Sequence, residues 1–157
     1  MDYEAQKKLL VGDAFEPVRY RVYPETPLAE VVDLMVRRSV RALPVVGEAF
    51  EVLGIITAGD ALDQVLRDRP SEEAGEPHID GLAARDVMTR AVLCVSETQQ
   101  LVEAAQMMVN RDVEQLPVVR EGQLVGVITR DGLLKALHLG ATSGTRDETP
   151  EERQVDP

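Results

Sequence analysis

Aromatic residues and cysteine are scarce in this chain. Only 3% of the 157 residues are aromatic and none is Trp, so a folded core must be built from aliphatic side chains. Cys94 is the one cysteine, which excludes an internal disulfide and is typical of a reducing compartment. It falls within a predicted strand, and we interpret it as a small core or edge residue.

Long hydrophobic runs and basic clusters are also missing. No stretch approaches the ~20 apolar residues of a membrane-spanning helix, and the first residues do not resemble a signal peptide. The formal net charge of −11 makes binding to nucleic acid or to an acidic membrane surface unfavourable. We therefore expect a cytoplasmic protein with no nucleic-acid or membrane partner.

Known catalytic signatures are absent as well. The sequence contains no P-loop, no nucleophile elbow, no HExxH and no CxxC, and His78 and His138 stand at no recognisable catalytic spacing. Carboxylates at metal-ligand spacing are not evident either. We expect a protein that is not an enzyme and requires no cofactor or metal.

An internal repeat is the strongest feature that is present. Residues 43–57 read LPVVGEAFEVLGIIT and residues 116–129 read LPVVREGQLVGVIT. Residues upstream of these segments, such as Leu28 and Leu101 or Asp13 and Asp86, match at an offset of 73. The offset becomes 72 after the turn, because the first repeat has one more turn residue. This agreement in register indicates a duplication.

Each repeat has the pattern of a β-α-β-β-α unit. Residues 18–22 and 91–95 are predicted first strands, rich in β-branched residues. A helix follows, with Thr26 as a plausible N-cap and Pro27 at its first position in the first repeat. LPVV, a polar turn and a near-continuous apolar run predict two further strands. A second helix covers 60–66 or 131–139, and Gly140 suits its end.

These units predict an α/β (α+β) fold of two repeats. A three-stranded sheet with helices on one face cannot bury its other face alone, so we expect the repeats to pack sheet to sheet with pseudo-twofold symmetry, around a shared core. The predicted segments are an N-terminal helix (1–12), the first repeat (13–66), an acidic linker (67–81), the second repeat (82–140) and a disordered acidic tail (141–157).

The succession DVMTRAVLCV, helix, LPVV, turn, LVGVIT and helix resembles the cystathionine β-synthase (CBS) domain, and the tandem copy resembles a Bateman module. The resemblance covers nearly the whole chain. It implies two clefts between the repeats, frequent binding of adenine nucleotides, sometimes of S-adenosylmethionine or metal ions, and frequent dimerisation.

The resemblance also implies where a nucleotide would bind. Thr57 and Asp60 match a motif in which the hydroxyl reaches phosphate or ribose and the carboxylate accepts from the ribose hydroxyls, although Asp60 could simply cap a helix. Arg41 could pair with phosphate. The preferred site 1 comprises Val18, Arg19, Val40, Arg41, Ala42, Pro44, Thr57 and Asp60.

The second repeat departs from this motif. Gly132 stands where the aspartate is expected, and Asp131 comes one residue early, which turns its side chain by about 100° on a helix. Glu114 replaces the basic residue of the first repeat. Site 2 is therefore the doubtful one, with Ala91, Val92, Val113, Thr129, Arg130 and Asp131. Arg130 could reach across the pseudo-twofold axis.

Three functions remain open from the sequence. The first is a regulatory module that binds AMP, ADP or ATP and modulates a separate partner protein. The second is a ligand-free dimerisation or protein-interaction module, and the third is a site for S-adenosylmethionine or a divalent cation. Apolar residues on more than one side of the long helices favour a homodimer: Val31, Leu34, Met35, Ala104, Met107 and Met108.

Overall fold

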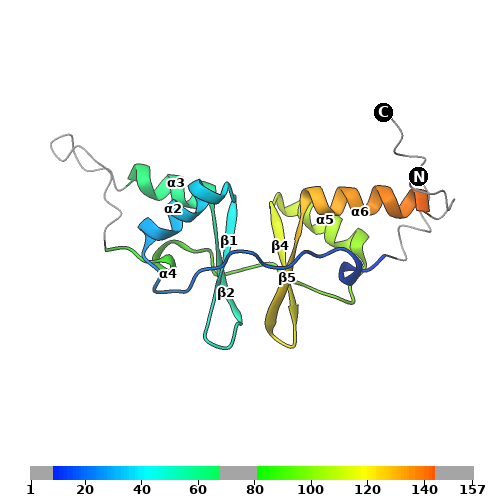
Figure 1. Cartoon of the computed structure of the whole chain (residues 1–157), viewed down its shortest axis with the longest axis horizontal. Helices are drawn as coiled ribbons and strands as arrows, with labels where there is room; N and C mark the ends of the chain where they lie inside the picture. The colour runs from blue at the N-terminus through cyan, green and yellow to red at the C-terminus, as the bar shows by residue number, and fades with distance from the viewer. Residues whose placement is uncertain (1–8, 68–80, 144–157) are drawn as a thin grey trace.

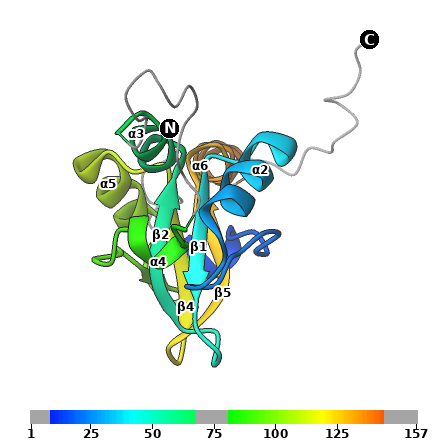
Figure 2. The same ribbon diagram turned by 90° about the vertical axis from the view of Figure 1, so that its left-hand side faces the viewer.

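The computed structural model of the chain describes residues 9–67 and 81–143. Two β-hairpins stand face to face at the centre and the helices cover their outer sides (Figures 1 and 2). The elements in chain order are η1 (Val11–Asp13), α2 (Leu28–Arg38), β1 (Ala42–Val46), β2 (Val52–Thr57), α3 (Ala58–Arg67), α4 (Ala84–Val87), β3 (Val95–Ser96), α5 (Leu101–Arg111), β4 (Gln115–Arg120), β5 (Gln123–Thr129) and α6 (Arg130–Ser143).

The two hairpins repeat one another in detail. β1 pairs antiparallel with β2 and β4 pairs antiparallel with β5, and the register of each shifts at the same place, between Val45 and Val46 and between Val118 and Val119. The tips of the hairpins are joined, because Leu124 N–H donates to Phe50 O over 2.9 Å. The predicted arrangement of two repeats packed sheet to sheet is confirmed.

The first predicted strand of each repeat is much shorter than expected. Within 18–22, only Val22 forms a bridge, parallel to Val45, and within 91–95 only Val95 belongs to a strand, β3, which pairs with β4. The physical reason is that these segments cross between the repeats and their backbones are spread over two sheets. Cys94 lies just before β3 and is half-buried, which raises the pKa of its thiol.

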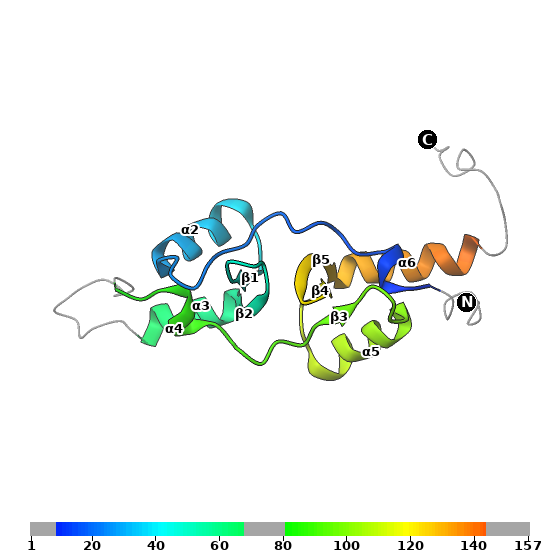
Figure 3. The same ribbon diagram turned by 90° about the horizontal axis from the view of Figure 1, so that it is seen from below.

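The segment before the long helix of each repeat, which we call its leading segment, pairs with the hairpin of the other repeat. Glu16 pairs with Val127 on β5, and Thr89 pairs with Ile55 on β2, through two backbone hydrogen bonds of 2.8–3.0 Å in each case. Figure 3 shows the two crossing segments on opposite sides of the hairpins. The same exchange places η1 beside the second repeat and α4 beside the first, so the repeats are interlinked and not merely in contact.

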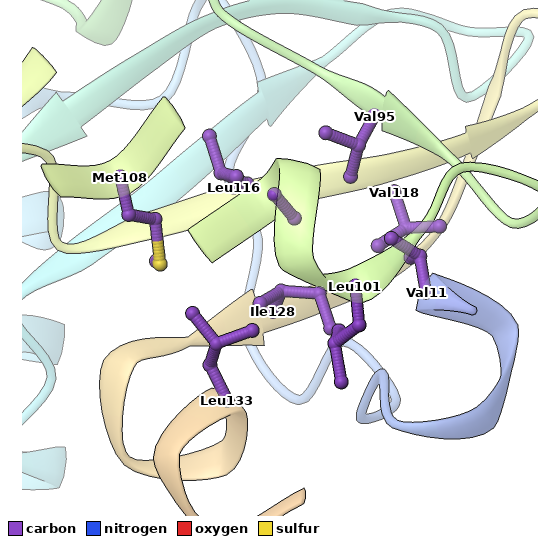
Figure 4. Close-up of a cluster of buried hydrophobic side chains, with 9 residues drawn as sticks. Val11, Val95, Leu101, Met108, Leu116, Val118, Ile128 and Leu133 are labelled. Atoms are coloured by element: carbon purple, nitrogen blue, oxygen red, sulfur yellow. The ribbon is translucent and has the colours of Figure 1, made fainter. Parts of the chain in front are cut away.

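The buried side chains form two clusters, which corrects the prediction of one shared sheet core. Each cluster lies between a hairpin and its own helices, with one residue from the other repeat's leading segment: Val11 in the second cluster and Ala84 in the first. Figure 4 shows Val11 packed among the residues of the second cluster. That cluster contains Val11, Val95, Leu101, Ala104, Met108, Leu116, Val118, Ile128 and Leu133.

Helix ends differ from two expectations. The N-cap of α2 is Pro27 and not Thr26, whose hydroxyl instead accepts a hydrogen bond from Tyr23 N–H at 2.9 Å. Gly140 does not end α6, which continues to Ser143, and the absence of a side chain at Gly140 lets Leu9 pack against the helix. A glycine inside α6 is therefore explained by the space that Leu9 needs.

Several predicted segments lie partly or wholly outside the described residues. These are residues 1–8 of the predicted N-terminal helix, 68–80 of the linker with His78, and 144–157 of the tail. Residues 11–13 form a 3-10 helix, and residues 141–143 belong to α6. Within the described ranges, every helix is too short or too polar to cross a lipid bilayer.

Candidate functional site: two clefts between the repeats

Two clefts open where residues of both repeats meet. Cleft A has a volume of about 680 Å³, and its lining comes from the segment before α2, the start of β1 and the junction of β5 with α6. It includes Glu16, Pro17, Val18, Arg19, Tyr20, Val40, Arg41, Ala42, Pro44, Glu114, Gln115, Val127, Thr129, Arg130 and Asp131.

Cleft B has a volume of about 520 Å³ and is the pseudo-symmetric counterpart of cleft A. Its lining comes from the segment before β3, the start of β4 and the junction of β2 with α3. It includes Arg41, Ala42, Ile55, Thr57, Ala58, Gly59, Asp60, Thr89, Ala91, Val92, Leu93, Arg111, Asp112, Val113, Glu114, Gln115 and Pro117.

The structure divides each predicted site between the clefts. From site 1, Thr57 and Asp60 line cleft B, whereas Val18, Arg19, Val40 and Pro44 line cleft A; Arg41 and Ala42 line both. From site 2, Ala91, Val92 and Val113 line cleft B, and Thr129, Arg130 and Asp131 line cleft A. The grouping by repeat is thus corrected, because each leading segment crosses to the other hairpin. The ligand role of these residues stays a prediction.

Thr57 and Asp60 form a reciprocal pair at the start of α3. Asp60 N–H donates to Thr57 Oγ1 at 3.0 Å, and Thr57 N–H donates to Asp60 Oδ2 at 3.1 Å. This is a capping box in which Thr57 is the cap and Asp60 the third helical residue, so Asp60 is not itself the N-cap. The pairing holds the carboxylate at the edge of cleft B with acceptor capacity to spare, because an ionised carboxylate has about four lone-pair sites.

The corresponding junction of cleft A has a different arrangement. Gly132 N–H donates to Thr129 Oγ1 at 3.0 Å, as in the first repeat, but no side chain follows at position 132. Glu16 fills that place from the crossing segment. Its Oε2 lies 3.5 Å from Thr129 Oγ1 and 2.9 Å from where a Cβ on Gly132 would be.

Arg41 and Glu114 occupy equivalent positions in the two repeats and face one another. Arg41 Nη2 lies 3.6 Å from Glu114 Oε2, and both side chains line both clefts. The repeat pattern predicted Arg41 at one site and Glu114 at the other. The structure instead places the pair between the clefts, where Glu114 partly offsets the positive charge that Arg41 offers to a phosphate.

Arg130 does not reach across the pseudo-twofold axis to a hydrogen-bond partner. Its guanidinium donates to Val113 O at 2.9 Å and to Asp112 Oδ1 at 3.0 Å, both in its own repeat. These contacts hold it at the rim of cleft A, where Arg19 also lies. Among residues 9–67 and 81–143, no three His, Cys, Asp or Glu side chains gather as metal ligands do.

Sequence reasoning missed Glu16 and Thr89, which line the clefts from the crossing segments, and Arg111 of cleft B. The sequence does contain an indication of the crossing segments, namely a glycine in the middle of each apolar run. A Cβ on Gly54 would come within 2.9 Å of Thr89 O, and a Cβ on Gly126 within 2.6 Å of Glu16 O. A glycine inside a strand often marks such a close backbone approach.

Comparison with known proteins agrees with this architecture. The family model described as CBS domain matches residues 16–67 and 84–139, and the chain therefore belongs to the CBS domain family. Its fold is that of a CBS pair, or Bateman module.

Two relatives agree with membership of that family. CBSX1, a chloroplastic CBS domain-containing protein of Arabidopsis thaliana, is 30% identical in an alignment 146 positions long, which covers 80% of this chain and 62% of CBSX1. An inosine-5'-monophosphate dehydrogenase of Methanocaldococcus jannaschii is 32% identical over 115 residues, 73% of this chain but 21% of that enzyme. The chain thus spans less than two thirds of either relative.

The solved structure of one similar protein contains a ligand. The crystal structure of CBSX2 in complex with AMP matches with a TM-score of 0.68 and 28% identity, and covers 82% of this chain and 95% of that one. A second crystal structure of CBSX2, from Arabidopsis thaliana, matches with a TM-score of 0.72 and 26% identity over 89% of this chain.

Proposed function

We propose that this chain is a regulatory CBS pair that binds an adenine nucleotide (AMP, ADP or ATP) in cleft B and thereby modulates a partner protein. The observation that carries the proposal is the Asp60 carboxylate, held by the Thr57 backbone beside an apolar wall formed by Ala91, Val92 and Val113. The carboxylate would accept from the ribose hydroxyls, and the apolar wall would contact adenine. The AMP complex of CBSX2 supports the choice of an adenine nucleotide.

Two arginines of cleft B could contact the phosphate end of such a ligand. Arg41 and Arg111 line the cleft, and α3 begins at its edge, where the Ala58 and Asp60 N–H groups already donate to Arg41 O and Thr57 Oγ1. Guanidinium groups and helix N-termini both favour phosphate. Asp60, Asp112 and Glu114 line the same cleft, so the two guanidinium groups supply positive charge for a phosphate without making the cleft positive overall.

Regulation would follow from the origin of the cleft residues. Thr57 and Asp60 belong to the first hairpin and its helix, whereas Val113 and Glu114 belong to the second repeat. A ligand that contacts both repeats restrains their relative orientation. The ligand can shift the equilibrium between two orientations by no more than the difference between its binding free energies for them. A partner that recognises one orientation would respond to that shift.

A thermal-shift experiment tests the binding step. Purified chain is melted with AMP, ADP, ATP, NAD or S-adenosylmethionine, since the last shares the adenosine group. A ligand present at 100 times its Kd stabilises the fold by roughly 2.7 kcal/mol, which gives a clear rise in Tm. We expect a rise with at least one adenine nucleotide.

The ligand-induced rise should disappear in Asp60→Ala. That substitution also removes a capping interaction, so the matched control is Asp86→Ala, which removes the equivalent carboxylate contact to Ala83 N–H (2.8 Å) outside both clefts. Asp86→Ala should lower the Tm of the free protein yet keep the ligand-induced rise. An unchanged melting curve with every nucleotide would rule out the proposed function.

A dimerisation module is the second candidate. The apolar residues that suggested a dimer from the sequence are used inside the monomer: Val31, Met35, Ala104 and Met108 are buried, and Leu34 and Met107 pack against the two clusters. Other apolar residues are exposed at equivalent positions of the two repeats, Val36 and Val109 (73% and 77%) and Leu62 and Leu134 (59% and 70%).

These paired positions favour a homodimer whose interface uses the helices of both repeats. Light scattering coupled to size-exclusion chromatography tests it: we expect a dimer at micromolar concentration and a monomer for Val36→Glu combined with Val109→Glu. Arg37→Gln with Asn110→Glu, at the neighbouring exposed positions, changes the net charge by the same amount and is the charge-matched control. A monomeric wild-type chain would contradict the dimer.

A further inference from the structure

Cleft A has Gly132 at the helix position where cleft B has Asp60, and the Glu16 carboxylate lies beside that glycine. We propose that Glu16 is the ribose-binding carboxylate of cleft A, and that the chain consequently binds two ribose-containing ligands, one in each cleft. The inference rests on the proposed function and extends it to the cleft whose sequence motif is broken.

The position of Glu16 relative to Thr129 carries the inference. Thr129 Oγ1 accepts from Gly132 N–H (3.0 Å), and lies 3.5 Å from Glu16 Oε2, to which its hydroxyl can donate. Glu16 Oε2 is also 2.9 Å from the place of a Cβ on Gly132. The carboxylate therefore enters from a different segment but lies where the side chain of an aspartate at 132 would begin.

The backbone holds Glu16 in place. Glu16 N–H donates to Val127 O at 2.8 Å and Val127 N–H donates to Glu16 O at 2.9 Å. Gly126 permits this pairing, since a side chain there would clash with Phe15 and with Glu16 O. Glu16 is thus attached to β5 two residues before Thr129, and its side chain has only a short distance to cover.

The two clefts carry reciprocal residues at the same two positions. Cleft A has Glu16 on the crossing segment and Gly132 on the helix, and cleft B has Thr89 on the crossing segment and Asp60 on the helix. At these two positions each cleft therefore has one carboxylate, in addition to Glu114, which lines both clefts, Asp131 in cleft A and Asp112 in cleft B. An aspartate at position 132 would stand beside the Glu16 carboxylate and repel it, because Glu16 Oε2 lies 2.9 Å from the place of a Cβ there.

The remainder of cleft A fits the same class of ligand. Arg19, Arg41 and Arg130 line it and supply positive charge for a phosphate, while Val18 and Val40 offer apolar contacts. A carboxylate can accept hydrogen bonds from both neighbouring hydroxyls of a ribose. A 2'-deoxynucleotide should therefore bind less tightly to both clefts.

Isothermal titration calorimetry with AMP, ADP and ATP tests the inference. We expect two ligands per chain for the wild type. Glu16→Gln should weaken one of the two sites by about 10- to 100-fold, which is the effect of removing a charge-assisted hydrogen bond. Asp60→Asn should weaken the other site, and the double variant should lose both. Asp86→Asn, a carboxylate change outside the clefts, is the control that keeps two ligands.

An exchange of residues gives a second, independent test. Glu16→Thr combined with Gly132→Asp rebuilds cleft A with the residue types of cleft B and should restore the site that Glu16→Thr alone loses. Gly132→Asp alone should lower the Tm, because its side chain would meet the Glu16 carboxylate. Tm values of all variants show which of them fold.

The outcomes separate the inference from the proposed function. One ligand per chain, lost in Asp60→Asn and retained in Glu16→Gln, would uphold the proposed function and overturn the inference. Two ligands whose affinities are both unchanged by Glu16→Gln would overturn it as well. No heat of binding from any nucleotide would overturn the proposed function and the inference together.

Discussion

Cleft A and cleft B are built from corresponding elements but carry different polar groups. Cleft B keeps the Thr57–Asp60 pair of its own hairpin and helix, and cleft A combines Thr129 with Glu16 from a segment more than a hundred positions earlier in the chain. In an interlinked duplication, corresponding places in the two clefts can thus be occupied by side chains from different segments, because the fold brings those segments to one point.

The largest effects on stability should come from truncating side chains in the two hydrophobic clusters, and the losses should be similar if the clusters contribute equally. Leu43 and Leu116 occupy matching positions and are each 0–1% exposed. We expect Leu43→Ala and Leu116→Ala to reduce the free energy of unfolding by about 2–5 kcal/mol each. Urea denaturation followed by circular dichroism measures this, and Val36→Ala, at an exposed position, is the control with little effect.

The number of unfolding transitions tests whether the two clusters depend on one another. Val11 and Ala84 each pack into the other repeat's cluster, so we expect both clusters to unfold in one transition in the wild type and in each variant. Two separate transitions, with only one displaced by Leu43→Ala, would show that the crossing segments do not couple the repeats.

The strand glycines should give the next largest effect. Gly126→Ala brings a Cβ within 2.6 Å of Glu16 O, and Gly54→Ala within 2.9 Å of Thr89 O. We expect each to destabilise the protein by about 1–3 kcal/mol, with the larger loss for Gly126→Ala. Thermal unfolding measures the losses.

Gly59→Ala is the control for the strand glycines. Its Cβ would meet only Thr57 Oγ1, at 3.7 Å, and alanine suits a helix better than glycine does. Unfolding temperatures of Gly54→Ala and Gly126→Ala as high as that of Gly59→Ala would contradict the close crossing of the two segments.

A smaller effect should come from the pair between the clefts. Removing the negative charge in Glu114→Gln should strengthen AMP binding and Arg41→Gln should weaken it, each by roughly fivefold, the effect of about 1 kcal/mol for an exposed charge pair. Calorimetry at two salt concentrations measures both, and the differences should shrink at high salt. A change of the same sign in both variants would show that their charges do not act on the ligand.

The smallest effect concerns an ion pair that only the second repeat has. Glu97 and Arg120 form two hydrogen bonds of 2.6–2.7 Å, whereas the equivalent positions in the first repeat are Pro24 and Gly47. Arg120 lowers the pKa of Glu97. A lowered pKa of a carboxyl in the folded state adds stability above its ordinary pKa, which is lost as the pH falls through the lower value.

Arg120→Gln should therefore reduce stability slightly at neutral pH and not at all well below the pKa of Glu97 in the folded state. Nuclear magnetic resonance titration of the Glu97 carboxyl should show a higher pKa in the variant. The same pKa in both proteins would show that the pair does not form in solution.

Much of the fold could be predicted from periodicity. The spacing of apolar residues predicted a helix before each LPVV run, where α2 and α5 lie, and the LPVV and VLGIIT or LVGVIT runs form β1, β2, β4 and β5. These elements are local, since their hydrogen bonds join residues near one another in the chain. The predicted first strands were too long, because a β-branched segment indicates extended backbone but not its partner.

The candidate site was only half predictable for the same reason. Thr57 and Asp60 are three residues apart, and their pairing is decided by the start of a helix. Glu16 and Thr129 are distant in sequence, and no spacing rule joins them. The glycines within the apolar runs indicated a close backbone approach but not which segment approaches.

The sequence by itself determined the duplication, the family, the hairpins and the long helices, because each depends on residue type at short separation. Only the tertiary structure decided which leading segment belongs to which hairpin, how the predicted site residues are shared between cleft A and cleft B, and that Glu16 lies beside Gly132. These depend on contacts between segments far apart in the chain, which are selected by packing and backbone pairing and not by local pattern.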